Sequence, residues 1–329
     1  MDERAGQLLW HARARALEAR ATAPSFVTKN EQMRRVRRIG WQLGVEEPVW
    51  SVNDKRDTYA WVDRMGIRRP AELARAVKVA ALGWTDLPDR IVLKPERGAG
   101  GHGIRLLERR DGTWFDLIGE VSVDVDELDR AHASLVDGGR VSAEVFAEEM
   151  VRDPQRPGGA PVDWKVYAFF GTVGMIAGRA RSVASDNGPR SRFRVFDASW
   201  RDFGPDVTRY RYDPGIAPPR HAEEVLDVAR RVSAAIPRAF VRVDLYDDEH
   251  GVVFGELTPE PGGPQRFRRD VDRRLGELWE EAEGRVQAYL ASTGLLRPAL
   301  QPLPHSAVVQ PLSPGAVRPA YPSYADDSS

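Results

Sequence analysis

Cysteine is absent from the 329 residues of this chain, and a strong net charge is absent as well. Without cysteine there can be no disulfide bonds and no thiolate zinc sites, a composition typical of a reducing compartment. A net charge of -1 gives no general attraction to nucleic acid or to an anionic membrane. No stretch approaches the roughly 20 apolar residues of a membrane span, and the charged first residues lack the apolar core of a signal peptide. We therefore expect a cytoplasmic protein that binds no nucleic acid and is not inserted in a membrane.

The composition is otherwise that of a globular protein, with 42% hydrophobic and 29% charged residues. A chain of this length suggests about two structural domains and can bury a large core. Apolar periodicity and capping residues predict helices at 4–21, 30–43, 55–65, 70–82, 124–135, 222–235 and 272–290. They predict strands at 91–93, 104–107, 141–150, 162–170, 173–181, 240–246 and 252–257. Residues 182–219 are expected to form a long excursion over a site.

The most informative pattern lies in the last two predicted strands. Alternation puts Arg242 and Asp244 on one face of the first strand, and Glu256 and Thr258 on one face of the second. The connection at 247–251 is short, so we expect an antiparallel hairpin in which the two faces coincide. Two carboxylates beside a hydroxyl and a guanidinium suit magnesium with a phosphate ligand. The alternative is a surface ion pair of Arg242 with one of the carboxylates.

A glycine-rich loop at 98–103 directly follows Lys94 and lies between two predicted strands. Backbone amides without side chains can approach phosphate oxygens closely, and a lysine adds a point charge. The loop lacks the Gly-Lys-Ser/Thr ending of a phosphate loop. It is not a dinucleotide fingerprint either, because a strand follows it rather than a helix. The pattern predicts a flexible flap over a nucleotide, with Gly100, Gly101 and His102 as candidate contacts. A glycine-rich hairpin without function, with His102 merely exposed, is the alternative.

A third pattern is the acidic strand end at 148–151, which is followed by Asp163 and Lys165. Adenine needs one backbone donor and one backbone acceptor in an apolar slot, and the end of a strand where the chain turns can supply both. Asp163 can accept hydrogen bonds from ribose hydroxyls, and Lys165 lies on the same face of its strand. The alternative is an acidic strand end without function.

Several arginines lie close to these patterns. Arg179 and Arg181 alternate onto one face of their strand, where they can meet a phosphate or a carboxylate substrate. Arg190, Arg192 and Arg194 are candidates to close over the site, and the basic helix segment at 34–38 is a candidate surface for a phosphate or a partner. For all of these arginines, the alternative is exposure to solvent without a binding role.

Taken in order, these segments resemble the ATP-grasp superfamily, in particular its TupA-like branch, which is associated with teichuronopeptide synthesis. The resemblance covers roughly residues 50–290 and depends on the joint order and spacing of short motifs. The matching segments are 53–55, 93–95 with the glycine loop, 148–151, 163–165, 242–246 and 255–259 with Gly262 and Gly263.

The resemblance implies an α+β fold in which two subdomains with antiparallel sheets clamp ATP, preceded by a short helical N-terminal region. The implied organisation is a helical region at 1–88, a lid subdomain at 89–151, a C-terminal subdomain with the metal site at 152–296, and a proline-rich tail at 297–329 that we expect to be disordered.

The resemblance also implies roles for the nucleotide-binding residues. Lys55 and Lys94 would hold the phosphates, and Asp163 would lie beside the ribose, with Lys165 on the same face. The adenine hinge would consist of Glu148, Glu149, Met150 and Val151, with backbone groups of Met150 or Val151 pairing with the base.

The implied metal site contains two magnesium ions bound by Asp244 and Glu256, with Glu256 bridging them. Thr258 stands where most members have asparagine, so it is a weaker candidate ligand. Arg242 would steady the transferred phosphoryl group, with Lys94 and Arg181 as the other catalytic candidates.

The implied reaction is a ligation that joins a small-molecule carboxylate to an amine. ATP phosphorylates the carboxylate, ADP leaves, and the amine then displaces phosphate to form an amide or peptide bond, in cell-surface polymer or secondary-metabolite synthesis. The protein would be a monomer or a homodimer. Two alternatives remain: a phosphotransferase, which the arginines favour, and a nucleotide-binding module without turnover, which Thr258 favours.

Overall fold

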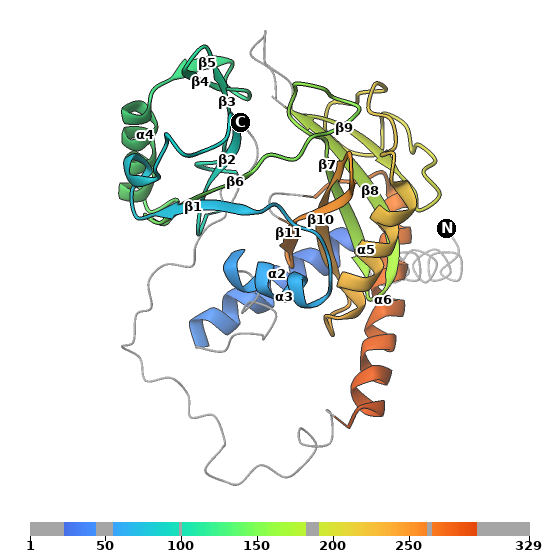
Figure 1. The fold of residues 1–329 in the computed structure, drawn as a ribbon. Coiled ribbons are helices and arrows are strands. Elements are labelled where there is room, and N and C mark those ends of the chain that lie inside the picture. Colours follow the sequence, from blue (N-terminus) through green and yellow to red (C-terminus); the bar gives the residue numbers. More distant parts are fainter. Residues whose placement is uncertain (1–22, 44–54, 99–100, 182–190, 262–264, 295–329) are drawn as a thin grey trace, which may run out of the picture.

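The structure, a computed structural model, describes residues 23–43, 55–98, 101–181, 191–261 and 265–294. It contains two antiparallel β-sheets that lie beside each other, with helices on their faces (Figure 1). The predicted α+β class with two antiparallel sheets is thereby confirmed. The predicted helix at 4–21, the predicted cap at 53–54 and the tail from 297 lie outside the described residues.

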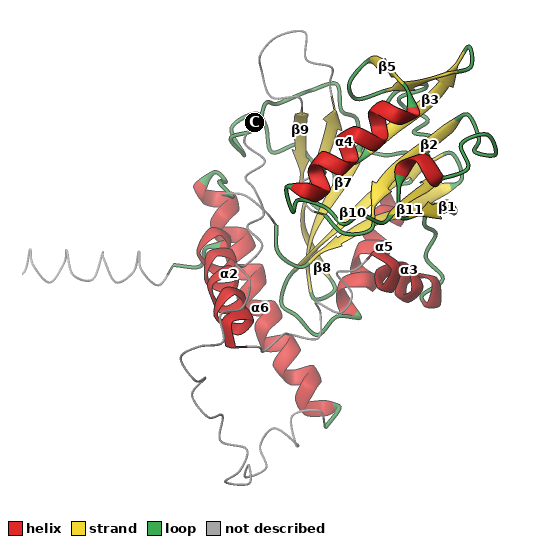
Figure 2. Cartoon of the chain, turned by 90° about the vertical axis from the view of Figure 1, so that its left-hand side faces the viewer, coloured by secondary structure: helices red, strands yellow, loops and turns green. Residues whose placement is uncertain are grey.

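One sheet has six strands in the order β1-β6-β2-β3-β4-β5. Its strands are β1 (Glu72–Ala76), β2 (Arg90–Pro95), β3 (Arg105–Arg110), β4 (Thr113–Asp116), β5 (Val121–Val123) and β6 (Val145–Glu149). One face packs against helix α4 (Val125–Asp137) and the short 3-10 helix η2 (Val79–Ala81), as Figure 2 shows for α4. Helix α4 begins with a capping box, in which Asp124 accepts from the backbone N–H of Glu127.

The prediction of a helix at 70–82 is wrong, because this segment forms β1 and η2. Alanine and leucine give the segment a helical preference, but such preferences are weak. Strand β1 pairs antiparallel with β6, where Ala74 lies opposite Ala147 and Ala76 opposite Val145. This pairing packs the two alanines of β1 against the buried core of the sheet. We therefore propose that the lid subdomain begins with β1 rather than at residue 89.

The other sheet has five strands in the order β11-β10-β7-β8-β9. Its strands are β7 (Asp163–Phe169), β8 (Thr172–Arg181), β9 (Ser191–Phe196), β10 (Val241–Asp248) and β11 (Gly251–Thr258). Helix α5 (Ala222–Ala234) covers one face, over a core that includes Trp164 and Val243. The predicted hairpin is β10 and β11, while β9 is a strand that the sequence did not predict.

The opposite face of this sheet is divided into an apolar and a polar half. Along β7, Tyr167 and Phe169 are buried against helices α2 (Phe26–Leu43) and α6 (Arg269–Ser292). Asp163 and Lys165 share that face of the strand but line a cleft instead. The two helices, which lie side by side in Figure 2, therefore leave the polar half of the sheet open.

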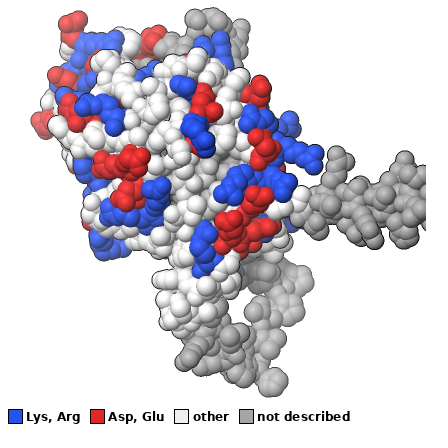
Figure 3. Space-filling model, turned by 90° about the vertical axis from the view of Figure 1, so that its right-hand side faces the viewer, with Lys and Arg blue, Asp and Glu red and all other residues white. Residues whose placement is uncertain are grey.

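The charged residues of these two helices are largely paired. Lys29 of α2 bonds Glu283 of α6 at 2.9 Å, and acidic and basic groups are interspersed over the face in Figure 3. Within the basic segment at 34–38, Arg34 and Arg37 each lie 3.1 Å from a different oxygen of Glu260, whose side chain is almost fully buried. These two arginines thus hold the segment that follows β11. Among the described helices, none is long and apolar enough to cross a membrane.

The contact between the start of α2 and α6 requires a residue without a side chain at position 276. A Cβ atom on Gly276 would lie 2.3 Å from the backbone nitrogen of Ser25. We expect Gly276→Ala to lower the free energy of unfolding by about 1–3 kcal/mol, because the two segments must move apart. Chemical denaturation measures this change.

Gly284→Ala is the matched control, because Gly284 is exposed on the same helix and its added methyl group would meet nothing within 4 Å. It should leave stability unchanged or raise it by up to about 1 kcal/mol, since alanine favours the helix. Equal stabilities of the two variants would contradict the close contact at Gly276.

Candidate active site

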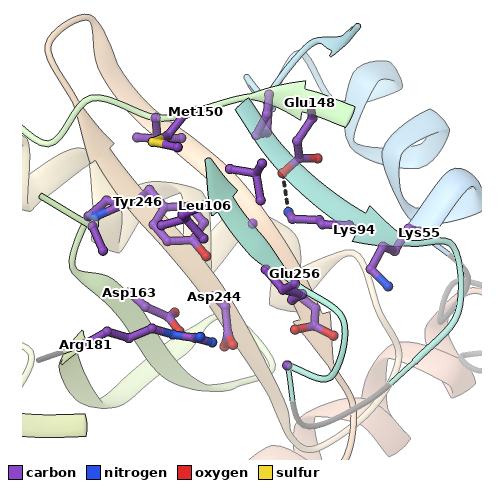
Figure 4. Close-up of a pocket in the computed structure, with 18 of the residues that line it drawn as sticks. Lys55, Lys94, Leu106, Glu148, Met150, Asp163, Arg181, Asp244, Tyr246 and Glu256 are labelled. Atoms are coloured by element: carbon purple, nitrogen blue, oxygen red, sulfur yellow. Dashed lines mark ion pairs between the residues drawn. The ribbon is translucent and has the colours of Figure 1, made fainter. Parts of the chain in front are cut away.

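A cleft that is partly open to solvent separates the two sheets and is lined by residues of both (Figure 4). One end of the cleft is apolar, where Val92, Leu106, Met150 and Ala160 form a small buried cluster. Glu149 and Val151 also line this end, at the point where the chain leaves β6. The predicted hinge residues therefore border an apolar slot.

Two lysines line the cleft close to strand β2 of the six-stranded sheet. Lys94, on β2, forms an ion pair with Oε1 of Glu148 on β6 (Figure 4). Lys55 lies at the start of helix α3 (Lys55–Arg64) and donates to the carbonyl oxygens of Pro95 at 3.1 Å and Glu96 at 3.2 Å. Burial lowers the pKa of Lys55, and Glu256 across the cleft only partly offsets this effect.

Two carboxylates lie opposite each other on the five-stranded sheet, because Asp244 of β10 pairs in register with Glu256 of β11. Beyond this pair the register shifts, and Leu245 pairs with Phe254, so Gly255 is the extra residue of a β-bulge. A regular strand would place Phe254 and Glu256 on one face. The bulge instead keeps Phe254 in the core and turns Glu256, which is exposed, into the cleft.

Arg242 lies one row further along the same hairpin, opposite Thr258. Its Nε lies 2.6 Å from Oδ1 of Asp244, and its Nη2 lies 2.7 Å from Oδ2 and 3.0 Å from the hydroxyl oxygen of Thr258. Burial would lower the pKa of Arg242, but Asp244 raises it above the usual value. Arg242 is thus fixed by its neighbours in the charged state, and the predicted face of the hairpin is confirmed.

A chain of ion pairs continues onto β7 and β8. Lys165 lies 2.9 Å from Asp163 and 2.5 Å from Asp244, and Arg179 lies 3.2 Å from Asp163. Burial opposes ionisation of Asp163, but Lys165 and Arg179 outweigh it and hold the pKa of Asp163 well below its usual range. Oδ1 of Asp163 is buried without a hydrogen-bond partner among the described residues, so its capacity to accept a hydrogen bond is unused there.

The glycine-rich loop approaches the other sheet near Arg181. A Cβ atom on Gly101, whose φ is +74°, would lie 3.1 Å from Nη2 of Arg181. His102 lines the cleft beside Gly101, whereas Gly100 lies outside the described residues. The loop and Arg181 thus meet across the mouth of the cleft.

Residues 32–280 match the protein family described as TupA-like ATPgrasp. The chain belongs to this family. The match includes the whole cleft, and the resemblance predicted from the short motifs is confirmed. No curated protein shows significant sequence similarity to the chain.

Several solved structures are similar to this ATP-grasp chain at low identity. D-alanine–D-alanine ligase from Bacillus anthracis, complexed with ATP, is 16% identical over 77% of this chain and 75% of its own, with a TM-score of 0.46. The ATP-grasp ligase PsnB, complexed with a minimal precursor, is 16% identical over 72% of this chain, with a TM-score of 0.41, and the match covers only 61% of PsnB. D-cycloserine synthetase DcsG is 16% identical over 71% of each chain, with a TM-score of 0.42.

The donor atoms of this ATP-grasp site fit magnesium when phosphate completes the coordination. Within the described residues, no three His, Cys, Asp or Glu side chains come together as a metal site. Asp244 and Glu256 do offer carboxylate oxygens on one face of two adjacent strands. Magnesium in nucleotide sites is held by one or two carboxylates together with substrate phosphates. Thr258 as a third ligand stays a prediction, since its hydroxyl already accepts from Arg242.

The structure adds residues that the motifs did not predict. Tyr59 of α3 donates to Glu148 at 2.8 Å, and Tyr246 lines the cleft next to Asp244 on β10. Only the pairing of distant segments identifies Tyr59, whereas the position of Tyr246 followed from the same alternation as Asp244.

The expectation that Arg192 and Arg194 close over the site is not met. Arg194 turns to the other face, bonds Asp202 at 2.8 Å, and shares that face with Arg192, while Arg190 lies outside the described residues.

The bulge at Gly255 provides a test of the carboxylate pair. A Cβ atom there would lie 2.6 Å from the ring of Tyr246 and 3.1 Å from the carbonyl oxygen of Asp244. We expect Gly255→Ala to move Glu256 away from Asp244 and to weaken binding of magnesium–ATP about tenfold or more. Titration calorimetry measures this affinity.

Gly159→Ala is the control, because its added methyl group would meet no atom closer than 3.6 Å. Its affinity should stay at the wild-type value. An unchanged affinity in a folded Gly255→Ala protein would show that the bulge does not position Glu256.

Proposed function

We propose that this chain is an ATP- and magnesium-dependent ligase that joins a carboxylate to an amine and releases ADP and phosphate. One observation carries the proposal: Asp244 and Glu256, paired on β10 and β11, lie across a cleft from Lys55 and Lys94. An arrangement of two carboxylates facing two lysines suits a metal-bound polyphosphate. Membership in the ATP-grasp family supports ATP as that polyphosphate.

The lining of the cleft supports one orientation of the nucleotide. The apolar slot around Met150 suits the adenine, and the unpartnered oxygen of Asp163 suits a ribose hydroxyl. The phosphates then extend toward Lys94 and Lys55 on one side and toward the carboxylate pair on the other. In this orientation the terminal phosphate would lie near Asp244, which is bonded to Arg242.

The reaction then proceeds in two displacements. An oxygen of the substrate carboxylate attacks the terminal phosphorus of ATP, the bond to the ADP oxygen breaks, and ADP departs. The amine nitrogen attacks the carbonyl carbon of the acyl phosphate, phosphate leaves, and the nitrogen loses a proton. Magnesium held by Asp244 and Glu256 would neutralise charge on the phosphates. Lys94, Arg242 and Arg181 would add positive charge around the transferred group, and no covalent protein intermediate is required.

Glu256→Gln tests the proposed activity, because it removes the charge of one carboxylate and keeps the shape of the side chain. We expect ADP release to fall roughly 100-fold or more while the fold is retained. The assay follows ADP and phosphate with panels of amino acids, dipeptides and sugar acids, and mass spectrometry identifies the product. Glu249→Gln is the control, since Glu249 lies exposed in the turn of the same hairpin.

The outcomes separate the candidate functions. Release of both ADP and phosphate that depends on both an acid and an amine supports the ligase. A phosphorylated product without free phosphate would select a phosphotransferase, and ATP binding without turnover would select a binding module. Near wild-type activity of Glu256→Gln would remove Glu256 from the metal site.

The lowered pKa of Lys55 gives ATP binding a pH dependence. Phosphates favour the protonated amine, so affinity should fall as the pH rises through this lowered pKa. We expect wild-type protein to take up protons when it binds ATP at alkaline pH, while Lys55→Arg takes up fewer because guanidinium stays charged. Calorimetry in buffers of different ionisation enthalpy measures the uptake. Equal uptake by both proteins would contradict the role of Lys55.

A further inference from the structure

Helix α3 contacts both sheets although it belongs to neither. Val62 is fully buried in the core of the five-stranded sheet, together with Tyr59 of the same helix. Phe146, from β6 of the six-stranded sheet, belongs to the same cluster and meets the ring of Tyr59 edge-on, with centroids 6.5 Å apart. Figure 1 shows α3 below the junction of the two sheets. The helix is therefore placed to connect the core of one sheet with the cleft side of the other.

The hydroxyl group of Tyr59 makes the polar part of this connection. It donates to Oε2 of Glu148 at 2.8 Å, while Oε1 of the same carboxylate pairs with Lys94. Glu148 is only 1% exposed and Tyr59 only 6%. The guanidinium of Arg69 lies over the ring of Tyr59, 4.9 Å from its centroid. Each carboxylate oxygen of Glu148 thus has its own donor, Lys94 for Oε1 and Tyr59 for Oε2. Packing fixes the position of the Tyr59 ring.

Loss of the Tyr59 hydroxyl would leave one carboxylate oxygen of Glu148 without its hydrogen-bond donor. A buried carboxylate oxygen without a donor is costly, so the carboxylate would rotate to share both oxygens with Lys94. The ammonium of Lys94 would then be drawn toward β6 and away from the cleft. Core packing gives no reason for a hydroxyl at this position, because a phenylalanine ring would fill the same space.

We propose that Tyr59 is a positioning residue of the nucleotide site, which holds Glu148 so that Lys94 is presented to the phosphates. The proposal rests on the proposed function, since it takes the cleft to bind ATP. Lys55 supports it, because it lies one helical turn before Tyr59 and bonds the carbonyl groups of Pro95 and Glu96, directly after Lys94. Helix α3 thereby holds both β6 and the end of β2 around the same lysine.

The test is a double-mutant cycle on the dissociation constant for ATP, measured by titration calorimetry with the full chain. Tyr59→Phe should weaken ATP binding about tenfold, because a hydrogen bond to a buried charge is lost. In a Glu148→Gln background the same substitution should change the affinity less than about twofold, because the ion pair with Lys94 through which Tyr59 acts is already gone. A purely structural role would give the same loss in both backgrounds.

Val62→Ala is the matched control on the same helix. It removes two buried methyl groups from the core and should lower the melting temperature, yet leave ATP affinity within about twofold of wild type. Wild-type affinity of Tyr59→Phe, equal losses in both backgrounds, an equal loss in Val62→Ala, or an unfolded Tyr59→Phe protein would each overturn the proposal. Failure of the wild-type chain to bind ATP would overturn the proposed function instead.

Discussion

The antiparallel register of β10 with its two neighbours is the constraint on which the cleft depends. It aligns Asp244 with Lys165 of β7 on one side and with Glu256 of β11 on the other, so three charged side chains form a row across the sheet. The bulge at Gly255 makes this row compatible with a packed core, because it separates the face of Glu256 from that of Phe254. A regular β11 in the same register would bury a carboxylate or expose an aromatic ring.

Charged side chains of the cleft are paired with one another. Asp244 is bonded by Lys165 and Arg242, and Asp163 by Lys165 and Arg179. Buried charges are tolerated only when they are paired. Pairing therefore lowers the pKa of Asp163 and raises the pKa of Arg242, so that both groups stay charged despite burial. A polyphosphate adds negative charge to this network, and a metal ion adds positive charge. The two therefore suit the site better together than either does alone.

The sequence predicted those features that depend on residues close together along the chain. The hairpin with Asp244 and Glu256 was predictable because alternation and a short connection are local features of the sequence. The family resemblance then suggested that the two carboxylates form a metal site. Strand β1 was not, because its alanines favour a helix and only pairing with β6 makes them a strand. The bond of Tyr59 to Glu148 spans 89 positions. Likewise, alternation shows that Arg192 and Arg194 share a face, but only the register with β8 shows that it is the face away from the cleft.

The N-terminal helices α2 and α3 contact the elements that form the cleft. Helix α2 inserts Phe26 among the aromatic rings of the five-stranded sheet, and its Arg34 and Arg37 hold Glu260 just beyond β11. Helix α3 packs on that same sheet and bonds β6 and the end of β2. A helix that is bound to both sheets limits how far the sheets can separate. Because α3 bonds the six-stranded sheet next to Lys94 and is buried against the sheet that carries Asp244, it restricts the width of the cleft at the end where Lys55 and Lys94 lie.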